Sequence, residues 1–316
     1  MAKGTARHKS KTQAAASASG KLGPIGLVLL SSFIWGLSGT AAQLLLHKYN
    51  FPTLLLVMLR LLISGLTLLI VFRPRFPRKD ARGLLLFAVI GLLPSQVFYL
   101  MAIYYSNVAT ATLLQYLFLP MTALYEMSTG KFRLTSLRLL AMAFAVVGTV
   151  LLVAGNPLNL KFEITPIGIA AALLSAFAVA YYTITSRNLT DKYGTWAVSA
   201  WGFLIGGIVA VPLSFGFGNM FAFSGYLLPV IGLVLFIAFF GTMLAYGFYI
   251  KGRTRLTGTE VAIAASTEPI AAAALSYLLL GVVLASFQYI GGLLIILAVV
   301  LLGLNSEEAP AEPIAE

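Results

Sequence analysis

The sequence predicts an all-α integral membrane protein with ten transmembrane helices, arranged as two inverted five-helix repeats. Three observations carry this prediction: an apolar composition, ten apolar stretches of helical length, and an internal duplication. Of the 316 residues, 59% are hydrophobic and 10% are charged, and the mean hydropathy is +0.94. Because a soluble domain carries about 25% charged residues, this chain cannot cover a surface that faces water on all sides.

Ten stretches of the chain are long and apolar enough to be transmembrane helices. A helix needs ~20 mostly apolar residues to cross the hydrocarbon core of a bilayer, which is ~30 Å thick. The connections between the stretches are short and leave no room for a soluble catalytic domain. The predicted spans are 23–46, 52–72, 82–105, 107–129, 134–154, 165–187, 193–215, 225–250, 257–280 and 286–304.

Positive charge is distributed unevenly between the two sides of these spans. With the N-terminus inside, all but Lys48, Arg60 and Lys161 of the 21 Lys and Arg residues fall in cytoplasmic segments. The positive-inside rule therefore predicts that both termini are cytoplasmic. The net charge of +11 is then a topology signal. No nucleic-acid partner is expected, because no basic surface is interleaved with aromatic residues.

The chain divides into two repeats with a tail at each end. Residues 1–22 contain no acid and are expected to be a disordered basic cytoplasmic tail, and residues 305–316 an acidic one. The first repeat is expected to cover residues 23–155 and the second residues 165–304.

The duplication is clearest where two stretches of the chain align. Residues 109–123 resemble residues 258–272, and three pairs are identical: Thr110/Thr259, Pro120/Pro269 and Ala123/Ala272. Because each repeat holds five spans, an odd number, the second repeat must enter the membrane upside down. Inverted repeats around a shared central site are typical of secondary transporters.

Glu268 is the first candidate site residue, because charge inside the hydrocarbon is expensive and needs a reason. It lies about ten residues into the ninth span, roughly 15 Å deep at 1.5 Å per residue. Burial disfavours a carboxylate, so Glu268 is a candidate proton carrier or a counter-ion for a cationic substrate. A permanent structural pairing with Arg60 or with a neighbouring helix is the alternative.

Arg60 lies about eight residues into the second span, at a depth compatible with that of Glu268. Two roles remain open for this side chain. It can form a structural or gating ion pair with Glu268, or it can hold the carboxylate of a substrate through its two-pronged guanidinium.

Pro120 and Pro269 occupy matching positions in the two repeats. The missing N–H of Pro269 frees the carbonyl of Ala265 and weakens the helix there. Paired Pro or Gly interruptions in corresponding spans point to the binding site of a transporter. We therefore expect both prolines to mark helix breaks with a gating role.

Polar and aromatic side chains in the middle of the spans are expected to line a central cavity. Gln115 belongs to a polar face of the fourth span, and a polar stripe in lipid should face a cavity. Aromatic faces can bind a cation or contact an apolar metabolite. The aromatic candidates are Trp35, Tyr99, Tyr116, Tyr182 and Tyr246.

The residues that are missing exclude several kinds of enzyme. Asp occurs only at positions 80 and 191 and His only at positions 8 and 47, all in tails or loops, and there is no Cys. No catalytic residue, no metal site and no cofactor is expected, and no phosphate-binding G-x-x-x-x-G-K-[ST] motif is present. The sequence therefore predicts that the protein is not an enzyme.

The sequence resembles the EamA-like branch of the drug/metabolite transporter superfamily. The resemblance covers residues 23–304 and is carried by 33–41 in the first span, Arg60-Leu61, 109–116 and 265–269. It implies ten helices in two inverted repeats. It further implies a central cavity built by the first four helices of each repeat, with the fifth helices peripheral. Leu119 stands where the second repeat has Glu268, so the two copies are not chemically equivalent.

The leading functional hypothesis is a secondary transporter that works by alternating access on a small amphipathic metabolite, amino-acid-like or amine-like. Export is the expected direction and protons are the candidate coupling ion. The expected partners are the substrate and the lipid bilayer, the expected oligomer is a monomer or a homodimer, and the expected location is a bacterial inner membrane. The alternative is a passive facilitator or channel for small metabolites.

Overall fold

The computed structural model describes residues 2–129, 135–154, 164–216, 227–253 and 264–304, and every regular element within these ranges is helical. Six of the helices are long and apolar enough to cross a membrane. Four shorter apolar helices lie at 108–122, 139–152, 267–280 and 286–301. The all-α, multi-spanning prediction is confirmed at this level.

The helices of the first half follow the predicted stretches closely. They are α1 (Ala2–Lys48), α2 (Thr53–Phe72), α3 (Ala81–Leu86), the π-helical segment η2 (Phe87–Leu92), α4 (Leu93–Tyr105), α5 (Val108–Gln115), α6 (Phe118–Ser128) and α7 (Ser136–Ala154). A short 3₁₀ turn, η1 (Arg78–Asp80), precedes α3.

The described helices of the second half follow a similar order. It contains α8 (Pro166–Tyr193), α9 (Thr195–Gly216), α10 (Leu227–Phe236), the π-helical segment η3 (Ile237–Leu244), α11 (Ala245–Arg253), α13 (Thr267–Leu280) and α14 (Ser286–Leu304). The predicted span 257–280 begins outside the described residues, as does the first part of the repeat 258–272. The acidic tail 305–316 also lies outside them.

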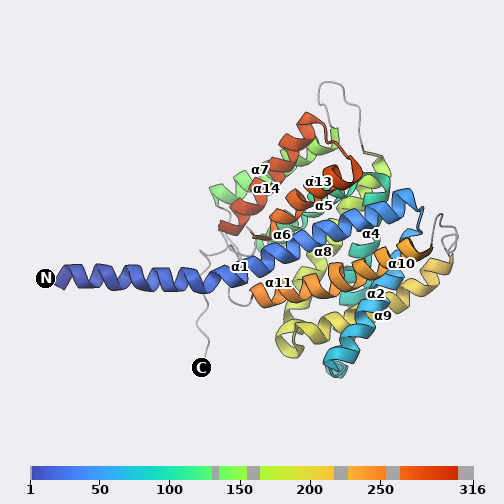
Figure 1. Cartoon of the computed structure of the whole chain (residues 1–316), viewed down its shortest axis with the longest axis horizontal. Helices are drawn as coiled ribbons and strands as arrows, with labels where there is room; N and C mark the ends of the chain where they lie inside the picture. The colour runs from blue at the N-terminus through green and yellow to red at the C-terminus, as the bar shows by residue number, and fades with distance from the viewer. Residues whose placement is uncertain (1, 130–134, 155–163, 217–226, 254–263, 305–316) are drawn as a thin grey trace.

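One expectation differs from the structure at the N-terminus. Residues 2–22, expected to be disordered, continue α1 backwards as a helix that extends away from the bundle (Figure 1). The physical reason is composition, because this segment is rich in Ala and Lys, which are strong helix formers.

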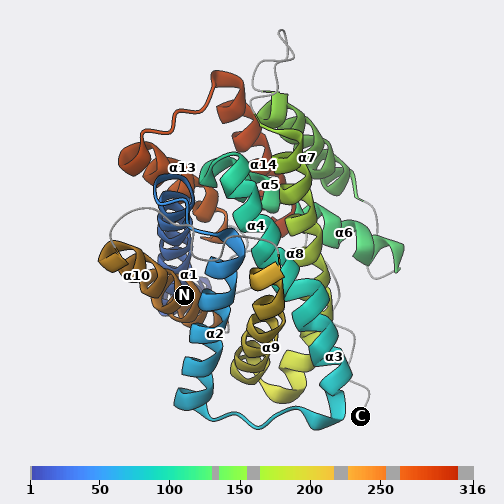
Figure 2. The same cartoon turned by 90° about the vertical axis from the view of Figure 1, so that its right-hand side faces the viewer.

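Helices from the two halves pack against one another in matching pairs. The second spans, α2 and α9, lie together, and so do α7 and α14, which run side by side at one edge of the bundle (Figures 1 and 2). The first helix of each half packs on helices of the other half. Thus α1 contacts α11 and α13, while α8 contacts α4, α5 and α6.

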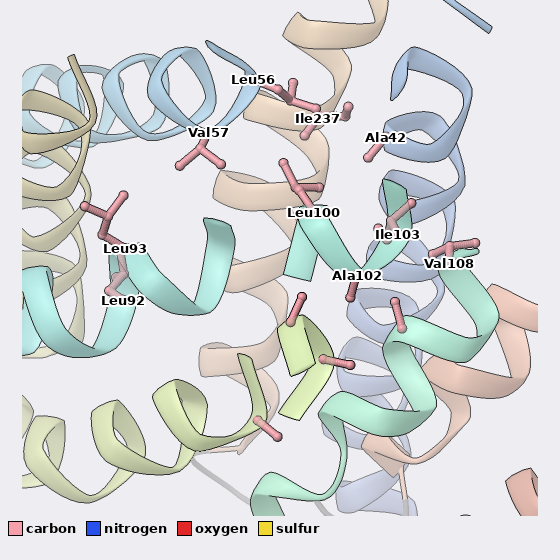
Figure 3. Packing of buried hydrophobic residues seen from close by; sticks show 14 of the residues in the cluster. Ala42, Leu56, Val57, Leu92, Leu93, Leu100, Ala102, Ile103, Val108 and Ile237 are labelled. Atoms are coloured by element: carbon pink, nitrogen blue, oxygen red, sulfur yellow. The ribbon is translucent and has the colours of Figure 1, made fainter. Parts of the chain in front are cut away.

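Apolar side chains fill the space between these helices. Figure 3 shows Leu100 of α4 close to Leu56 of α2 and Ile237 of η3, with Ala102 and Ile103 further along α4. All five are fully buried. This packing holds α2, α4 and η3 in fixed positions, and the polar residues described below project from these same elements.

Glycines permit the closest helix contacts, as expected where helices associate without a hydrophobic driving force. A Cβ on Gly65 would lie 2.6 Å from the backbone N of Leu204, and one on Gly207 would lie 2.9 Å from the backbone N of Leu62. Gly148 and Gly291 make the same kind of contact between α7 and α14.

We expect the substitution Gly291→Ala to lower the thermal unfolding temperature of the purified protein. The new Cβ would lie 2.7 Å from the backbone N of Leu152, so α7 and α14 would have to separate, at a cost of about 1–3 kcal/mol. The matched control is Gly232→Ala in α10, where no heavy atom lies within 4 Å of the new Cβ. If both variants unfold at the same temperature, the close contact does not contribute to stability.

Candidate functional site

Two π-helical segments occupy corresponding places in the two halves of the chain. In η3, the Thr242 hydroxyl donates to the carbonyl of Ile237, five residues earlier, at 3.0 Å. In η2, Gly91 lets α8 approach closely, because a Cβ at this position would lie 2.6 Å from the Cβ of Tyr182. Such π-bulges are frequent at functional sites because they re-aim side chains. Here η3 positions the Thr242 side chain, and Gly91 of η2 leaves room for Tyr182 of α8.

Arg60 of α2 is held in place by the π-helical segment η3. Its Nε donates to the Thr242 hydroxyl at 2.7 Å. Within the described part of the chain this is its one recorded hydrogen bond, and Arg60 and Glu268 do not form an ion pair there. Arg60 nevertheless lies close enough to Glu268, Tyr99 and Tyr246 to interact with them electrostatically. The guanidinium therefore has N–H groups that these described residues do not use.

The fourth span is interrupted just before Pro120. Helix α5 ends at Gln115 and α6 begins at Phe118. Because Pro120 has no N–H to offer the carbonyl of Tyr116, that carbonyl accepts from the backbone N of Leu119 instead, at 3.1 Å. The carbonyl that Pro120 leaves without its usual donor is thus satisfied by the backbone of the same segment.

The stretch predicted as the ninth span is interrupted at the equivalent place. Residues 264–265 are helical, Ser266 is a turn, and α13 begins at Thr267. Pro269 cannot donate to the carbonyl of Ala265, and the Tyr116 hydroxyl donates to that carbonyl instead, at 2.7 Å. A side chain of the first half therefore supplies the hydrogen-bond donor that the backbone of the second half lacks.

Glu268 lies in the first turn of α13, directly beside this break. Its Oε2 is 2.9 Å from the hydroxyl of Tyr116. The side chain lies deep in the protein, yet part of its surface remains accessible. The carboxyl group thus stands at the positive end of the α13 helix dipole.

Aromatic side chains from both halves extend from this point. The ring of Trp35 lies 5.8 Å from that of Tyr246 and 5.3 Å from that of Tyr249. Tyr182 lies within electrostatic range of Tyr246 and Glu268. The Tyr99 hydroxyl is bonded to Thr112 at 2.9 Å and lies within electrostatic range of Arg60 and Glu268.

The structure thus gathers most of the sequence candidates into one cluster. We define the central cluster by these residues: Trp35, Arg60, Tyr99, Tyr116, Tyr182, Tyr246, Tyr249, Thr242 and Glu268. Gln115 is not joined to it by a recorded contact. Its Nε2 donates to the Ser175 hydroxyl at 2.7 Å, and Ser175 donates in turn to the carbonyl of Ser95. Gln115 therefore links α5 to α8 and α4.

Two members of the central cluster were missed by sequence reasoning. Thr242 and Tyr249 lie four residues before and three residues after Tyr246, on the same helical face. This helical spacing from Tyr246 is the sequence pattern that could have identified both residues. The π-bulge that turns Thr242 towards Arg60 leaves no comparable trace in the sequence.

A buried polar cluster inside a multi-spanning helical bundle defines a class of protein that binds or moves a solute within the membrane. The EamA-like transporter family model matches this chain twice, over residues 22–154 and 166–304. The chain therefore belongs to the EamA-like transporter family. The resemblance proposed from the sequence is confirmed.

Individual relatives agree with this assignment. The chain is 35% identical over 288 residues to an uncharacterized inner membrane transporter, YicL, of Salmonella typhimurium, covering 88% of this chain and 94% of the relative. It is 25% identical to an uncharacterized transporter of Archaeoglobus fulgidus, over 87% and 95% of the two chains. A solved crystal structure shares the fold, with a TM-score of 0.61 and 19% identity, over 90% of this chain and 96% of that one.

Proposed function

We propose that this transporter moves a small amphipathic metabolite, amino-acid-like or amine-like, by alternating access, with the central cluster as its binding site. The observation that carries the proposal is that Arg60 and Glu268 lie in one cluster without pairing with each other. An uncompensated buried charge is costly, so a function is the simplest reason to keep both groups. A ligand that carries a carboxylate and an amino group satisfies both.

The aromatic members of the cluster support an amphipathic ligand. Trp35, Tyr246 and Tyr249 present ring faces from two different halves of the chain. An ammonium group near such faces gains cation–π attraction, and an apolar side chain gains contact area. We assign Arg60 to a substrate carboxylate and Glu268 to a proton or an amino group.

The same proposal includes the architecture expected from the sequence. The matched helix pairs, the matched π-segments and the matched breaks before Pro120 and Pro269 support ten spans in two inverted repeats. Alternating access then takes place as one repeat rocks against the other around the central cluster. We place the chain in an inner membrane, like its relative, with both termini cytoplasmic, and we assign export as the direction and protons as the coupling ion.

Ligand binding can be tested by thermal unfolding of the purified protein in the presence of amino acids and amines. A ligand at 100 times its Kd stabilises the folded state by about 2.7 kcal/mol, so a true ligand raises the unfolding temperature. A hit is then tested in proteoliposomes, where unlabelled ligand inside should accelerate uptake of labelled ligand. Uptake without this acceleration would indicate a passive facilitator and would contradict alternating access.

A further inference from the structure

The Tyr116 hydroxyl lies within hydrogen-bond distance of two oxygen atoms. One is the carbonyl of Ala265, at 2.7 Å, and the other is Oε2 of Glu268, at 2.9 Å. A phenol has a single proton and can make only one full donation. Two full hydrogen bonds at this hydroxyl therefore require a second proton, which a protonated Glu268 would supply.

With Glu268 protonated, both contacts are satisfied together. The carboxyl O–H donates to the phenol oxygen of Tyr116, and the phenol O–H donates to the carbonyl of Ala265. When Glu268 is ionised it can only accept. A charge-assisted bond to a carboxylate is roughly twice as strong as a neutral bond, so the phenol proton turns to Glu268. The Ala265 carbonyl then loses its donor.

The hydrogen bond that is lost, from Tyr116 to Ala265, is the one that satisfies the carbonyl at the break in the ninth span. In the first half, the carbonyl freed by Pro120 has a backbone donor, the N of Leu119 at 3.1 Å. In the second half, the carbonyl freed by Pro269 accepts a hydrogen bond from a side chain of the other half. A buried carbonyl without a donor is unfavourable, so the break at 265–267 is less stable when Tyr116 does not donate to it.

Titratable and charged groups from several helices surround Glu268. Arg60 of α2 lies within electrostatic range of the carboxyl group, which stands in the first turn of α13. Among the described residues, the other titratable groups within electrostatic range are Tyr99 of α4, Tyr116 itself and Tyr182 of α8. Tyr249 of α11 reaches Tyr116. Helix α1 contributes Trp35, which does not titrate.

We propose that Tyr116 is a positioning residue that couples protonation of Glu268 to the helix break at residues 265–267. Loss of the proton from Glu268 withdraws Tyr116 from Ala265 and loosens the start of α13, and rebinding of the proton closes the break again. This inference deepens the proposed function, because it supplies the step by which a coupling proton moves a helix of the transporter.

Amide hydrogen exchange of residues 264–280 in the detergent-solubilised protein tests this coupling without any substrate. After correction for the intrinsic pH dependence of exchange, the wild type should exchange about tenfold faster at high pH than at low pH. Glu268→Gln should be slow at both, because its amide donates permanently to Tyr116. Tyr116→Phe should be fast at both, because Ala265 has lost its donor.

The matched control is Tyr277→Phe, which removes a hydroxyl from an exposed tyrosine on the same helix and should keep the wild-type response. A wild-type exchange rate that does not change with pH overturns the proposal, and so does a Glu268→Gln variant that responds like the wild type. Both results are available even if Tyr116→Phe does not fold. The exchange experiment involves no ligand, so it can succeed even if the transport assay fails. If the exchange experiment fails, the proposed transport function can still be correct.

Discussion

Glu268→Gln is expected to abolish the pH-driven component of transport in proteoliposomes. The amide has nearly the shape of the carboxyl group and can still bond to Tyr116, but it cannot gain or lose a proton. We expect uptake under an imposed pH gradient to fall by at least about tenfold, towards the rate seen without a gradient, because positioned proton transfer contributes factors of this size or more. The measurement is initial uptake of labelled ligand at several internal and external pH values.

The matched control for this experiment is Asp80→Asn. Asp80 is an acid in the turn before α3, where it accepts from Tyr193 at 2.7 Å and pairs with Lys192 at 3.3 Å, away from the central cluster. The same acid-to-amide change there should leave the pH profile of uptake unchanged. Wild-type uptake and a wild-type pH profile in Glu268→Gln would mean that Glu268 is not the coupling group.

Arg60→Met is expected to abolish the preference of the site for ligands that carry a carboxylate. The wild type should bind an amino acid at least about 100-fold more tightly than its methyl ester, a difference of about 2.7 kcal/mol. The variant should bind both equally weakly, because it has lost the guanidinium that pairs with the carboxylate. Binding is measured by ligand-induced shifts in unfolding temperature over a concentration series.

Two further measurements separate a ligand role for Arg60 from a structural one. Arg60 has no ion-pair partner among the described residues, so its replacement by an apolar side chain of similar length breaks no ion pair there, and ligand-free Arg60→Met should unfold near the wild-type temperature. Arg60→Lys should keep partial discrimination, because it retains the charge without the two-pronged geometry. If Arg60→Met unfolds much earlier and weakens acid and ester equally, Arg60 is a structural residue.

Much of the fold was predictable because the bilayer restricts what a chain can do. Backbone groups in hydrocarbon must bond within their own segment, so apolar stretches such as 52–72 and 193–215 have to become helices, here α2 and α9. The N-terminal segment was less predictable. Residues 2–22 carry no apolar pattern, and their helix in the structure follows from composition alone.

The central cluster was predictable in its membership more than in its contacts. Glu268 and Arg60 were identifiable because charge in lipid is rare, and Tyr116 because it is an aromatic residue with a polar tip in the middle of a predicted span. Gln115 shares that region of the helix, yet it bonds to Ser175 instead. One residue of difference along a helix turns a side chain by about 100°, and no sequence pattern states which direction meets the other half.

By itself, the sequence determined that this protein is a helical membrane protein of the EamA-like family. It also determined where its few buried charges lie and that Pro269 frees the carbonyl of Ala265. These conclusions depend on composition and on local covalent geometry, which a linear chain already contains. Only the tertiary structure decided that Arg60 binds Thr242 rather than Glu268, and that Tyr116 donates to Ala265. Partners 149 and 182 residues apart are brought together by packing between helices, and short-range rules carry no information about distances of that kind.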